Sequence, residues 1–148
     1  MGKRSILLIV GGAAQGKRKF AAKLWNSRLE SEEKERRLDP EQMADGGLCS
    51  WEEFQQADAV FGLQEMIRRI LEAGEMPGED SGTEIARRII DEGKQYILIS
   101  DEVGCGIVPM DAFDREYREA VGRACCCLGE EAEEVWRVTA GIGQRIKP

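Results

Sequence analysis

Two short apolar runs predict buried strands of a parallel sheet. Residues 5–10 are apolar after the first position and are followed by two glycines, Gly11 and Gly12. Residues 96–100 form a second short run that is mainly apolar. Strands covered by helices on both faces need no polar alternation, so such runs are typical of parallel sheets. Residues 134–140 predict a third strand, and residues 141–147 close the chain. The sheet is therefore small, or a fourth strand lies near residues 41–49.

Helical patterns occupy the segments between these strands. Residues 17–37 predict one helix, whose second half carries acidic and basic residues four positions apart. Ser50 has the pattern of an N-cap with Glu53 completing a capping box, and apolar residues at helical spacing extend that helix to about Ala73. Further helices are expected at residues 83–92 and after Asp111. Strands that alternate with helices predict an α/β fold with a mainly parallel sheet.

Composition indicates one globular domain. The 148 residues are 42% hydrophobic and 33% charged, and no apolar run approaches the roughly 18 residues of a membrane helix. The five cysteines are odd in number and contain no C-x-x-C pair, which favours a reducing compartment and a structural role for the thiols. We expect a single domain over residues 1–148 that is cytoplasmic and has no membrane partner.

Charge and the missing histidine narrow the chemistry. The chain carries a net charge of −7, which disfavours nucleic acid as a partner. Residues 1–24, in contrast, contain six basic residues and no acidic one, so this segment is suited to anions. The chain contains no histidine, which removes the commonest general base and any histidine-bound intermediate.

A phosphate-binding loop is predicted at the end of the first strand. Residues 11–17, Gly-Gly-Ala-Ala-Gln-Gly-Lys, fit the first seven positions of G-x-x-x-x-G-K-[ST]. Glycines allow backbone N–H groups to approach phosphate oxygens, and the lysine reaches the β- and γ-phosphates. A strand-to-helix turn without a ligand is the alternative. The candidate nucleotide-binding residues are Gly11, Gly12, Ala13, Ala14, Gln15, Gly16, Lys17 and Arg18.

The eighth position of this motif is Arg18 instead of serine or threonine. The hydroxyl at that position normally binds Mg²⁺, and a guanidinium cannot bind a cation. Either Mg²⁺ is held by other groups and water, or nucleotide binds with weak metal support. Arg18 also adds a positive charge that can face phosphate.

Two acids follow the strand at residues 96–100. Asp101 and Glu102 come directly after its apolar residues, at the edge where phosphate-loop enzymes place carboxylates that hold Mg²⁺ or orient hydroxyl groups. Strands also end in solvated acids without a function. In combination with the phosphate loop, Lys17, Asp101 and Glu102 are the candidate catalytic residues.

A longer motif points to a family. Residues 101–109, Asp-Glu-Val-Gly-Cys-Gly-Ile-Val-Pro, resemble the Asn-Glu-Val-Gly-x-Gly-Ile-Val-Pro signature of the adenosylcobinamide kinase/adenosylcobinamide-phosphate guanylyltransferase family. The similarity continues through residues 115–118, 122–123, 134–136 and 141–147, and it includes the phosphate loop. It covers residues 6–24 and 96–147, roughly half of the chain.

The resemblance implies a fold and an activity. The fold is a three-layer α/β fold of the P-loop NTPase type with a small, mainly parallel sheet. The activity is phosphoryl transfer from ATP or GTP, with Mg²⁺, to the aminopropanol hydroxyl of adenosylcobinamide. In complete family members a histidine then carries GMP to the phosphorylated corrinoid, so this chain is expected to have lost that step. The partners are a nucleoside triphosphate and a corrinoid, and the assembly is a homo-oligomer, a trimer.

Individual positions carry this expectation or depart from it. Gly104, Gly106 and Pro109 are the expected substrate-binding residues, in a loop that follows the acidic strand end. Asp101 stands where the family has asparagine, and we hypothesise that it replaces the lost hydroxyl as a contact of the metal.

Two other functions stay open. A family member that has lost Mg²⁺ chemistry would be a nucleotide- or corrinoid-binding regulatory protein. A phosphate-loop kinase for another small alcohol is the third option. Metal dependence distinguishes the first two, because a kinase needs Mg²⁺ for turnover and a binding protein holds nucleotide with little metal effect.

Overall fold

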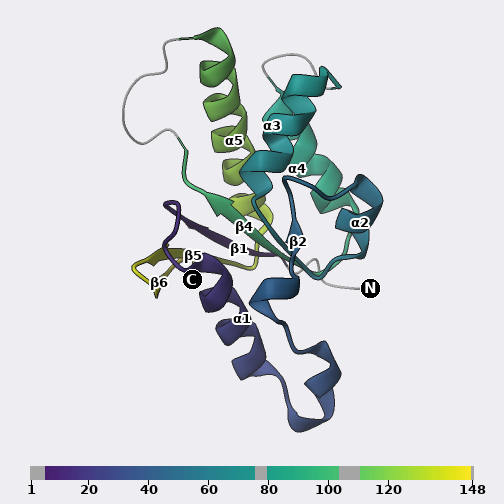
Figure 1. Ribbon diagram of the computed structural model, residues 1–148, viewed down its shortest axis with the longest axis vertical. Helices are drawn as coiled ribbons and strands as arrows, with labels where there is room; N and C mark the ends of the chain where they lie inside the picture. The colour runs from purple at the N-terminus through teal and green to yellow at the C-terminus, as the bar shows by residue number, and fades with distance from the viewer. Residues whose placement is uncertain (1–5, 76–79, 104–110, 148) are drawn as a thin grey trace.

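One sheet with helices on both faces forms the protein (Figure 1). The computed structural model describes residues 6–75, 80–103 and 111–147. Within these ranges the sheet has six strands in the order β2-β3-β4-β1-β5-β6. The strands are β1 (Ile6–Gly11), β2 (Ala44–Asp45), β3 (Ala59–Phe61), β4 (Tyr96–Asp101), β5 (Glu134–Thr139) and β6 (Ile142–Lys147).

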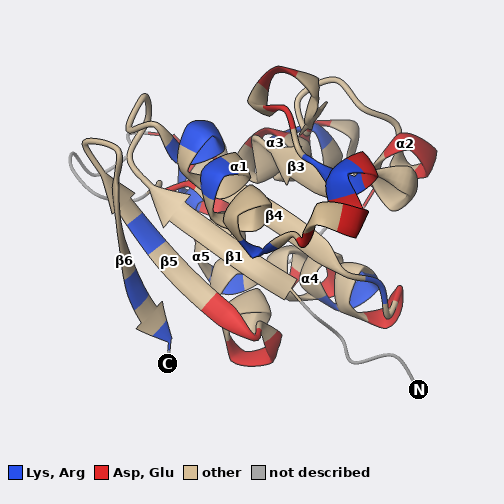
Figure 2. Ribbon diagram, turned by 90° about the horizontal axis from the view of Figure 1, so that it is seen from below, with Lys and Arg blue, Asp and Glu red and all other residues tan. Residues whose placement is uncertain are grey.

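Among the described strands, neighbours from β2 to β5 pair in parallel, whereas β6 pairs antiparallel with β5 at the edge of the sheet (Figure 2). This confirms the predicted α/β fold with a mainly parallel sheet.

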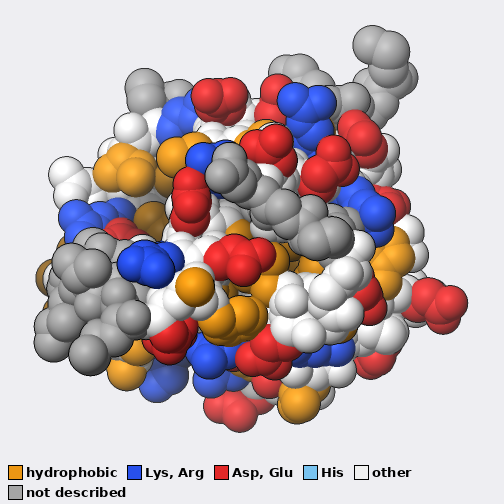
Figure 3. Space-filling model, turned by 90° about the horizontal axis from the view of Figure 1, so that it is seen from above, with side chains coloured by type: hydrophobic (Ala, Val, Ile, Leu, Met, Phe, Trp, Pro, Cys, Tyr) orange, Lys and Arg blue, Asp and Glu red, His pale blue; other side chains and the backbone are white. Residues whose placement is uncertain are grey.

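The helices make the outer layers. Figure 1 shows α1 on one side of the sheet and α3, α4 and α5 on the other. The helices are α1 (Lys17–Arg28), α2 (Trp51–Gln56), α3 (Leu63–Ala73), α4 (Ser81–Asp91) and α5 (Ala112–Glu131), with short 3-10 helices η1 (Ser31–Arg36) and η2 (Pro40–Gln42). None of these helices in the described ranges is long and apolar enough to cross a membrane. On the face seen in Figure 3, acidic and basic side chains are interspersed.

Two cores explain why the central strands are apolar throughout. Ile6 and Leu8 of β1 lie in the core under α2 to α5, whereas Leu7 and Ile9 lie in the core under α1. Successive side chains of a strand point to opposite faces. In a strand that is buried on both faces, every side chain enters a core, so apolar and polar residues do not alternate along it.

The helix predicted over residues 17–37 ends earlier, at Arg28. Leu29 has an extended backbone, and the amide of Asn26 pairs with the backbone of Leu38, donating to its carbonyl at 2.9 Å and accepting from its N–H at 2.8 Å. This turns the chain back along α1. The charged residues of η1 include no buried one, and without an apolar face a helix lacks the packing that stabilises it.

The helix predicted from Ser50 to about Ala73 is interrupted. The capping box is confirmed, because Ser50 and Glu53 exchange the expected hydrogen bonds at 3.1 Å. Helix α2 nevertheless ends at Gln56, and Ala59–Phe61 forms β3 beside β4. Val60 is fully buried there, so sheet pairing outweighed the helical spacing of this residue with its apolar neighbours.

The remaining sequence predictions for elements are largely confirmed. The strand sought near residues 41–49 is β2, and the Asp111 side chain caps α5 by accepting from Asp114 N–H at 2.7 Å. The closing segment forms β6, which the sequence did not reveal as a strand. A tight turn with positive φ at Ala140 (51°) and Gly141 (77°) joins it to β5.

Candidate functional site at the phosphate loop

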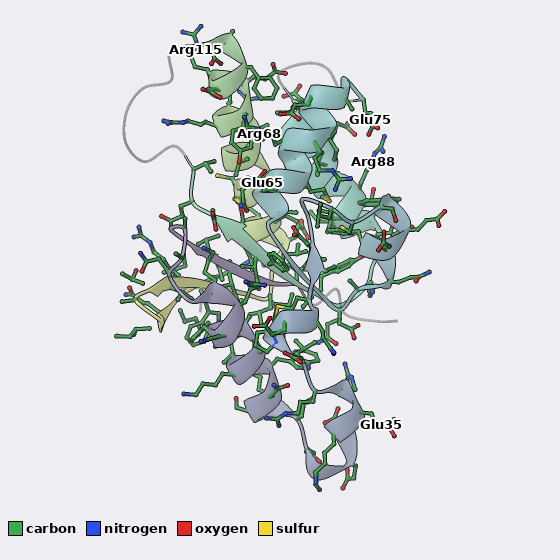
Figure 4. All side chains as sticks on the ribbon, viewed as in Figure 1. Glu35, Glu65, Arg68, Glu75, Arg88 and Arg115 are labelled. Carbon is green, nitrogen blue, oxygen red and sulfur yellow. The ribbon has the colours of Figure 1, made fainter. Side chains whose placement is uncertain are left out.

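The carboxyl ends of the parallel strands meet beside the loop that follows β1. A cavity of about 410 Å³ opens there. Residues 14–19 line one side of it, and side chains from the ends of β2, β3 and β4 and the start of α3 line the other. We call it the Asp101 cavity, and its far wall consists of Asp45, Phe61, Gly62, Gln64, Glu65, Ile99 and Asp101. Figure 4 shows Glu65 at the sheet end of α3.

Close packing holds the loop in place. A Cβ on Gly11 would collide with the carbonyl oxygen of Val138, so glycine is required where β1 passes β5. Gly16 precedes α1 with a φ of 83°. Gln15 is joined to the β5–β6 turn twice, because its carbonyl accepts from Gly141 N–H at 2.8 Å and its side chain accepts from Ala140 N–H at 2.6 Å.

Lys17 is buried, with 8% of its side chain exposed. Its ammonium donates to the carbonyl of Gly12 at 2.6 Å and lies 2.6 Å from Oδ1 of Asp101. The backbone N–H of Asp101 donates to the buried side chain of Gln64 at 3.0 Å. The structure thus brings Lys17 and Asp101 together at the cavity, as a preformed ion pair.

Glu102 points away from this cavity. Ile97 and Ile99 of β4 pack in the core under α1 and Leu98 in the opposite core, so the alternation along β4 places Asp101 on the α1 side and Glu102 on the other. Glu102 there forms a two-point ion pair with Arg137 of β5, at 2.9 and 3.0 Å. Its backbone N–H donates to Gly11 carbonyl at 2.8 Å. Two neighbouring candidates therefore lie on opposite faces of the sheet.

Arg18 lies at the mouth of the Asp101 cavity. Its guanidinium sits 4.3 Å from the centre of the Phe61 ring, a cation–π contact. The side chain is exposed and lines the cavity. It contributes a positive charge where a phosphate-loop hydroxyl would normally stand.

Sequence reasoning missed seven of the lining residues, among them three with polar or aromatic side chains near β2 and β3. Asp45, Phe61 and Gln64 belong to the segment around β2 and β3, whose strands are short. The only sequence signal was the turn at residues 45–47, where Asp45 Oδ1 accepts from Gly47 N–H at 2.8 Å. Gly104, Gly106 and Pro109, the expected substrate-binding residues, lie outside the described residues.

The site can contribute one or two carboxylates to a cation. Among the described residues no group of three or more His, Cys, Asp or Glu side chains is arranged to hold a metal. Magnesium beside a nucleotide commonly needs only one or two carboxylates, because phosphates and water fill the other positions. Asp101 fits that limited role, and Arg18 contributes no ligand.

The cysteines in the described ranges are free thiols. Burial raises the pKa of the Cys125 thiol, which keeps it protonated and unreactive. The arginines of α5 also match a charged surface: Arg115 lies at the end of α5 far from the sheet (Figure 4). Trp136 is half-buried and packs against Phe20, with ring centroids 5.4 Å apart.

The sheet, the glycine-rich loop before α1 and the buried lysine define an α/β protein of the phosphate-loop class. A family model described as CobU, cobinamide kinase/cobinamide phosphate guanyltransferase, matches residues 59–146, more than half of the chain. The chain therefore belongs to this family, which acts in adenosylcobalamin biosynthesis. The match begins in β3, so the phosphate loop precedes it.

Two curated proteins are similar to part of this chain. The bifunctional adenosylcobalamin biosynthesis proteins CobU of Salmonella typhimurium and of Escherichia coli are each 45% identical to it over 53 residues. The aligned segment covers 36% of this chain and 29% of each relative. The chain thus matches less than a third of the length of these relatives.

Proposed function

We propose that this chain is a single-domain kinase that transfers the terminal phosphate of ATP or GTP to the aminopropanol hydroxyl of adenosylcobinamide. The observation that carries the proposal is the buried Lys17 ammonium, which faces Asp101 at the wall of the Asp101 cavity. Family membership supplies the substrate class.

Positioning and charge stabilisation account for the chemistry of such a site. Phosphoryl transfer spreads negative charge over the phosphoryl oxygens, and preorganised cations and N–H groups stabilise that charge. Lys17 and the backbone of residues 12–17 would provide them. Asp101 would leave Lys17 when phosphate arrives and contribute a carboxylate to Mg²⁺, which neutralises the phosphates when bound.

Glu102 has an indirect part in this proposal. Its ion pair with Arg137 and its backbone bond to Gly11 connect β4 and β5 across the end of β1. These contacts support the base of the loop from the opposite face. A direct contact with substrate would require Glu102 to leave that ion pair.

The guanylyl transfer of the family is absent from this proposal, because no histidine exists in these 148 residues to carry GMP. The same reasoning leaves the corrinoid as acceptor, with residues 104–109 contributing to its binding. We also propose that the kinase assembles as a trimer, as the family resemblance implies.

A second candidate function follows from Arg18. Arginine stands in place of the metal-binding hydroxyl. The site therefore has basic side chains that can face phosphate but fewer oxygen ligands for Mg²⁺. Such a site would bind nucleotide without turnover and serve regulation. Both candidate functions require nucleotide binding. They differ in whether Mg²⁺ supports turnover.

The test is direct. Purified protein is incubated with adenosylcobinamide, Mg²⁺ and ATP or GTP, and the phosphorylated corrinoid is measured by mass spectrometry. Lys17→Ala should abolish the product, whereas Lys34→Ala, an exposed lysine in η1, should not. Folded protein that binds nucleotide but gives no product would favour the regulatory function.

A further inference from the structure

A second cavity opens between α2, α3 and α4, on the side of the sheet opposite α1. It has a volume of about 340 Å³, which is within the range of small-molecule sites. We call it the Trp51 cavity, and the residues that line it include Trp51, Met66, Arg69, Ile70, Ile85 and Arg88. In the described parts of the chain, no residue lines both this cavity and the Asp101 cavity.

The floor of the Trp51 cavity is apolar. Met66 and Ile70 lie one turn apart on α3, and Ile85 contributes from α4. Met66 and Ile85 are buried members of the core under these helices, and Ile70 packs against that core. The cavity therefore reaches core surface, where the apolar part of a ligand would be removed from water.

Trp51 adds a flat aromatic wall. Its ring stacks on the ring of the buried Phe54, with centroids 5.1 Å apart and 9° between the planes. This contact fixes the orientation of the Trp51 ring, yet 38% of the residue stays exposed, and Leu48 in the same segment is 81% exposed. One exposed apolar side chain is ordinary, but two beside an apolar cavity indicate a binding surface. Another aromatic ring can stack on such a wall.

Two arginines make the cavity basic, although the chain as a whole carries a net charge of −7. Arg69 is held in place, because its Nη1 donates to the carbonyls of Gly46 and Cys49 at 2.8 and 2.9 Å. These acceptors are neutral, so the charge of Arg69 is not cancelled by them. A guanidinium group matches a carboxylate through two parallel N–H bonds.

Arg88 can meet a ligand directly. It is exposed on α4, one turn after Ile85, and it forms no ion pair with any described residue. Glu75 also lines the cavity but is not paired with Arg88, so two guanidinium groups outweigh one carboxylate among the described lining residues. In Figure 4, Arg88 and Glu75 lie on one side of α3 and Arg68 lies on the other. Arg68, in contrast, already pairs with Glu72 at 3.1 Å.

We propose that the Trp51 cavity binds a small organic anion, a carboxylate carried by an aromatic ring system. The ring would lie against Trp51 and over the apolar floor, while the carboxylate accepts hydrogen bonds from Arg88 beside the charge of Arg69. An inorganic anion would leave the apolar floor uncovered, and a neutral aromatic compound would leave both guanidinium groups unused. The site is separate from the proposed kinase chemistry, because its described lining residues are different.

Calorimetric titration with two probes tests the chemistry of the site. 2-Naphthoate has the ring and the carboxylate, and 2-naphthamide has the same ring without the charge. Arg88→Gln should weaken 2-naphthoate about tenfold, as expected for one charge-assisted hydrogen bond, and leave 2-naphthamide nearly unchanged. The matched Arg87→Gln, at the next exposed position of α4 and outside the lining residues, should change neither. Equal losses for the two probes in Arg88→Gln, or no binding of 2-naphthoate to the folded wild-type protein, would overturn the proposal.

Nuclear magnetic resonance locates the bound probe. The tryptophans are Trp25, Trp51 and Trp136, and each gives one indole N–H signal in ¹⁵N-labelled protein. Trp51→Phe identifies the signal of Trp51, which 2-naphthoate should shift with or without tripolyphosphate. Shifts confined to the other two signals, or displacement of 2-naphthoate by tripolyphosphate, would overturn the proposal.

Two further outcomes separate the alternatives. Self-association that Trp51→Ala abolishes, without any binding of 2-naphthoate, would assign the cavity to a second copy of the chain and overturn the proposal. Binding of 2-naphthoate at Trp51 by a protein that binds no nucleotide would refute the proposed kinase function and support this site.

Discussion

The ion pair between Lys17 and Asp101 makes a sharp prediction about nucleotide binding. Incoming phosphate needs the Lys17 ammonium, whose closest anion is now the Asp101 carboxylate at 2.6 Å. Asp101→Asn removes that competing charge and the repulsion between the carboxylate and phosphate. Without metal, the variant should therefore bind ATP more tightly than the wild-type protein.

The magnitude follows from the exposure of the two side chains, 8% for Lys17 and 32% for Asp101. A fully exposed pair contributes at most about 1 kcal/mol. Two charges near a protein surface interact by about 4 kcal/mol at a separation of roughly 4 Å. Solvent screens Asp101 on its open side and asparagine still accepts a hydrogen bond, so we expect about 1–2 kcal/mol, a factor of roughly 5–30 in affinity.

Calorimetry in EDTA measures this factor, with Asp91→Asn at an exposed position of α4 as the matched control. With Mg²⁺ present, the same Asp101→Asn variant should lose turnover if Asp101 supplies a metal ligand. An unchanged or weaker affinity in EDTA would refute the reasoning, because it would mean that the carboxylate does not compete for Lys17.

Three other predictions concern contacts that hold the fold around the site. The side chains of Arg137 and Glu102 are 54% and 24% exposed, so a double-mutant cycle of Arg137→Gln and Glu102→Gln, measured by urea unfolding, should give a coupling energy of about 0.2–1 kcal/mol. Strictly additive losses would contradict a direct interaction. Lys147 donates to three carbonyls at the end of α5, those of Gly129, Glu130 and Ala132, at 2.6–2.8 Å, so Lys147→Met should lower the free energy of unfolding by about 1–3 kcal/mol, and a loss within error would show that the contacts add nothing. The hydrogen bond from Arg28 lowers the pKa of Glu134 from 4.5 to about 2, so the carboxylate contributes stability above pH 4.5 that is lost as the pH falls toward 2; in urea titrations the advantage of wild type over Glu134→Gln should shrink over that window, and a constant difference would argue against the linkage.

The central strands could be predicted because their environment is simple. Residues of β1 and β4 are buried on both faces, so hydrophobicity alone identifies them. β3 could not be predicted in this way, since it has only three residues and its strand state depends on the pairing of Ala59 with Ile97, far along the chain. Val60 and the apolar residues after it have helical spacing. That spacing does not reveal which backbone segments pair in a sheet, so it could not show that Val60 belongs to a strand.

The candidate site shows a similar limit. The glycines and Lys17 of residues 11–17 predict the phosphate loop. Asp101 and Glu102 lie on opposite faces of the sheet because side chains alternate along a strand, and this could have been predicted from the sequence. The Arg137 partner of Glu102 was not, because it requires the order β4-β1-β5. The hydrogen bonds between Gln15 and the β5–β6 turn depend on the same order, which sets this turn beside the loop.

The position of β1 in the sheet has a consequence for how the chain acquires its structure. β1 comes first in sequence, yet its two partners are β4 and β5, at residues 96–101 and 134–139. Contacts between such distant residues form slowly, because a long loop must close before they contribute. During synthesis β1 therefore stays unpaired until β4 and β5 have been made. The loop gains its hydrogen bonds to Ala140 and Gly141 only after the β5–β6 turn has been made, so nucleotide present during translation meets a complete loop only from that point on.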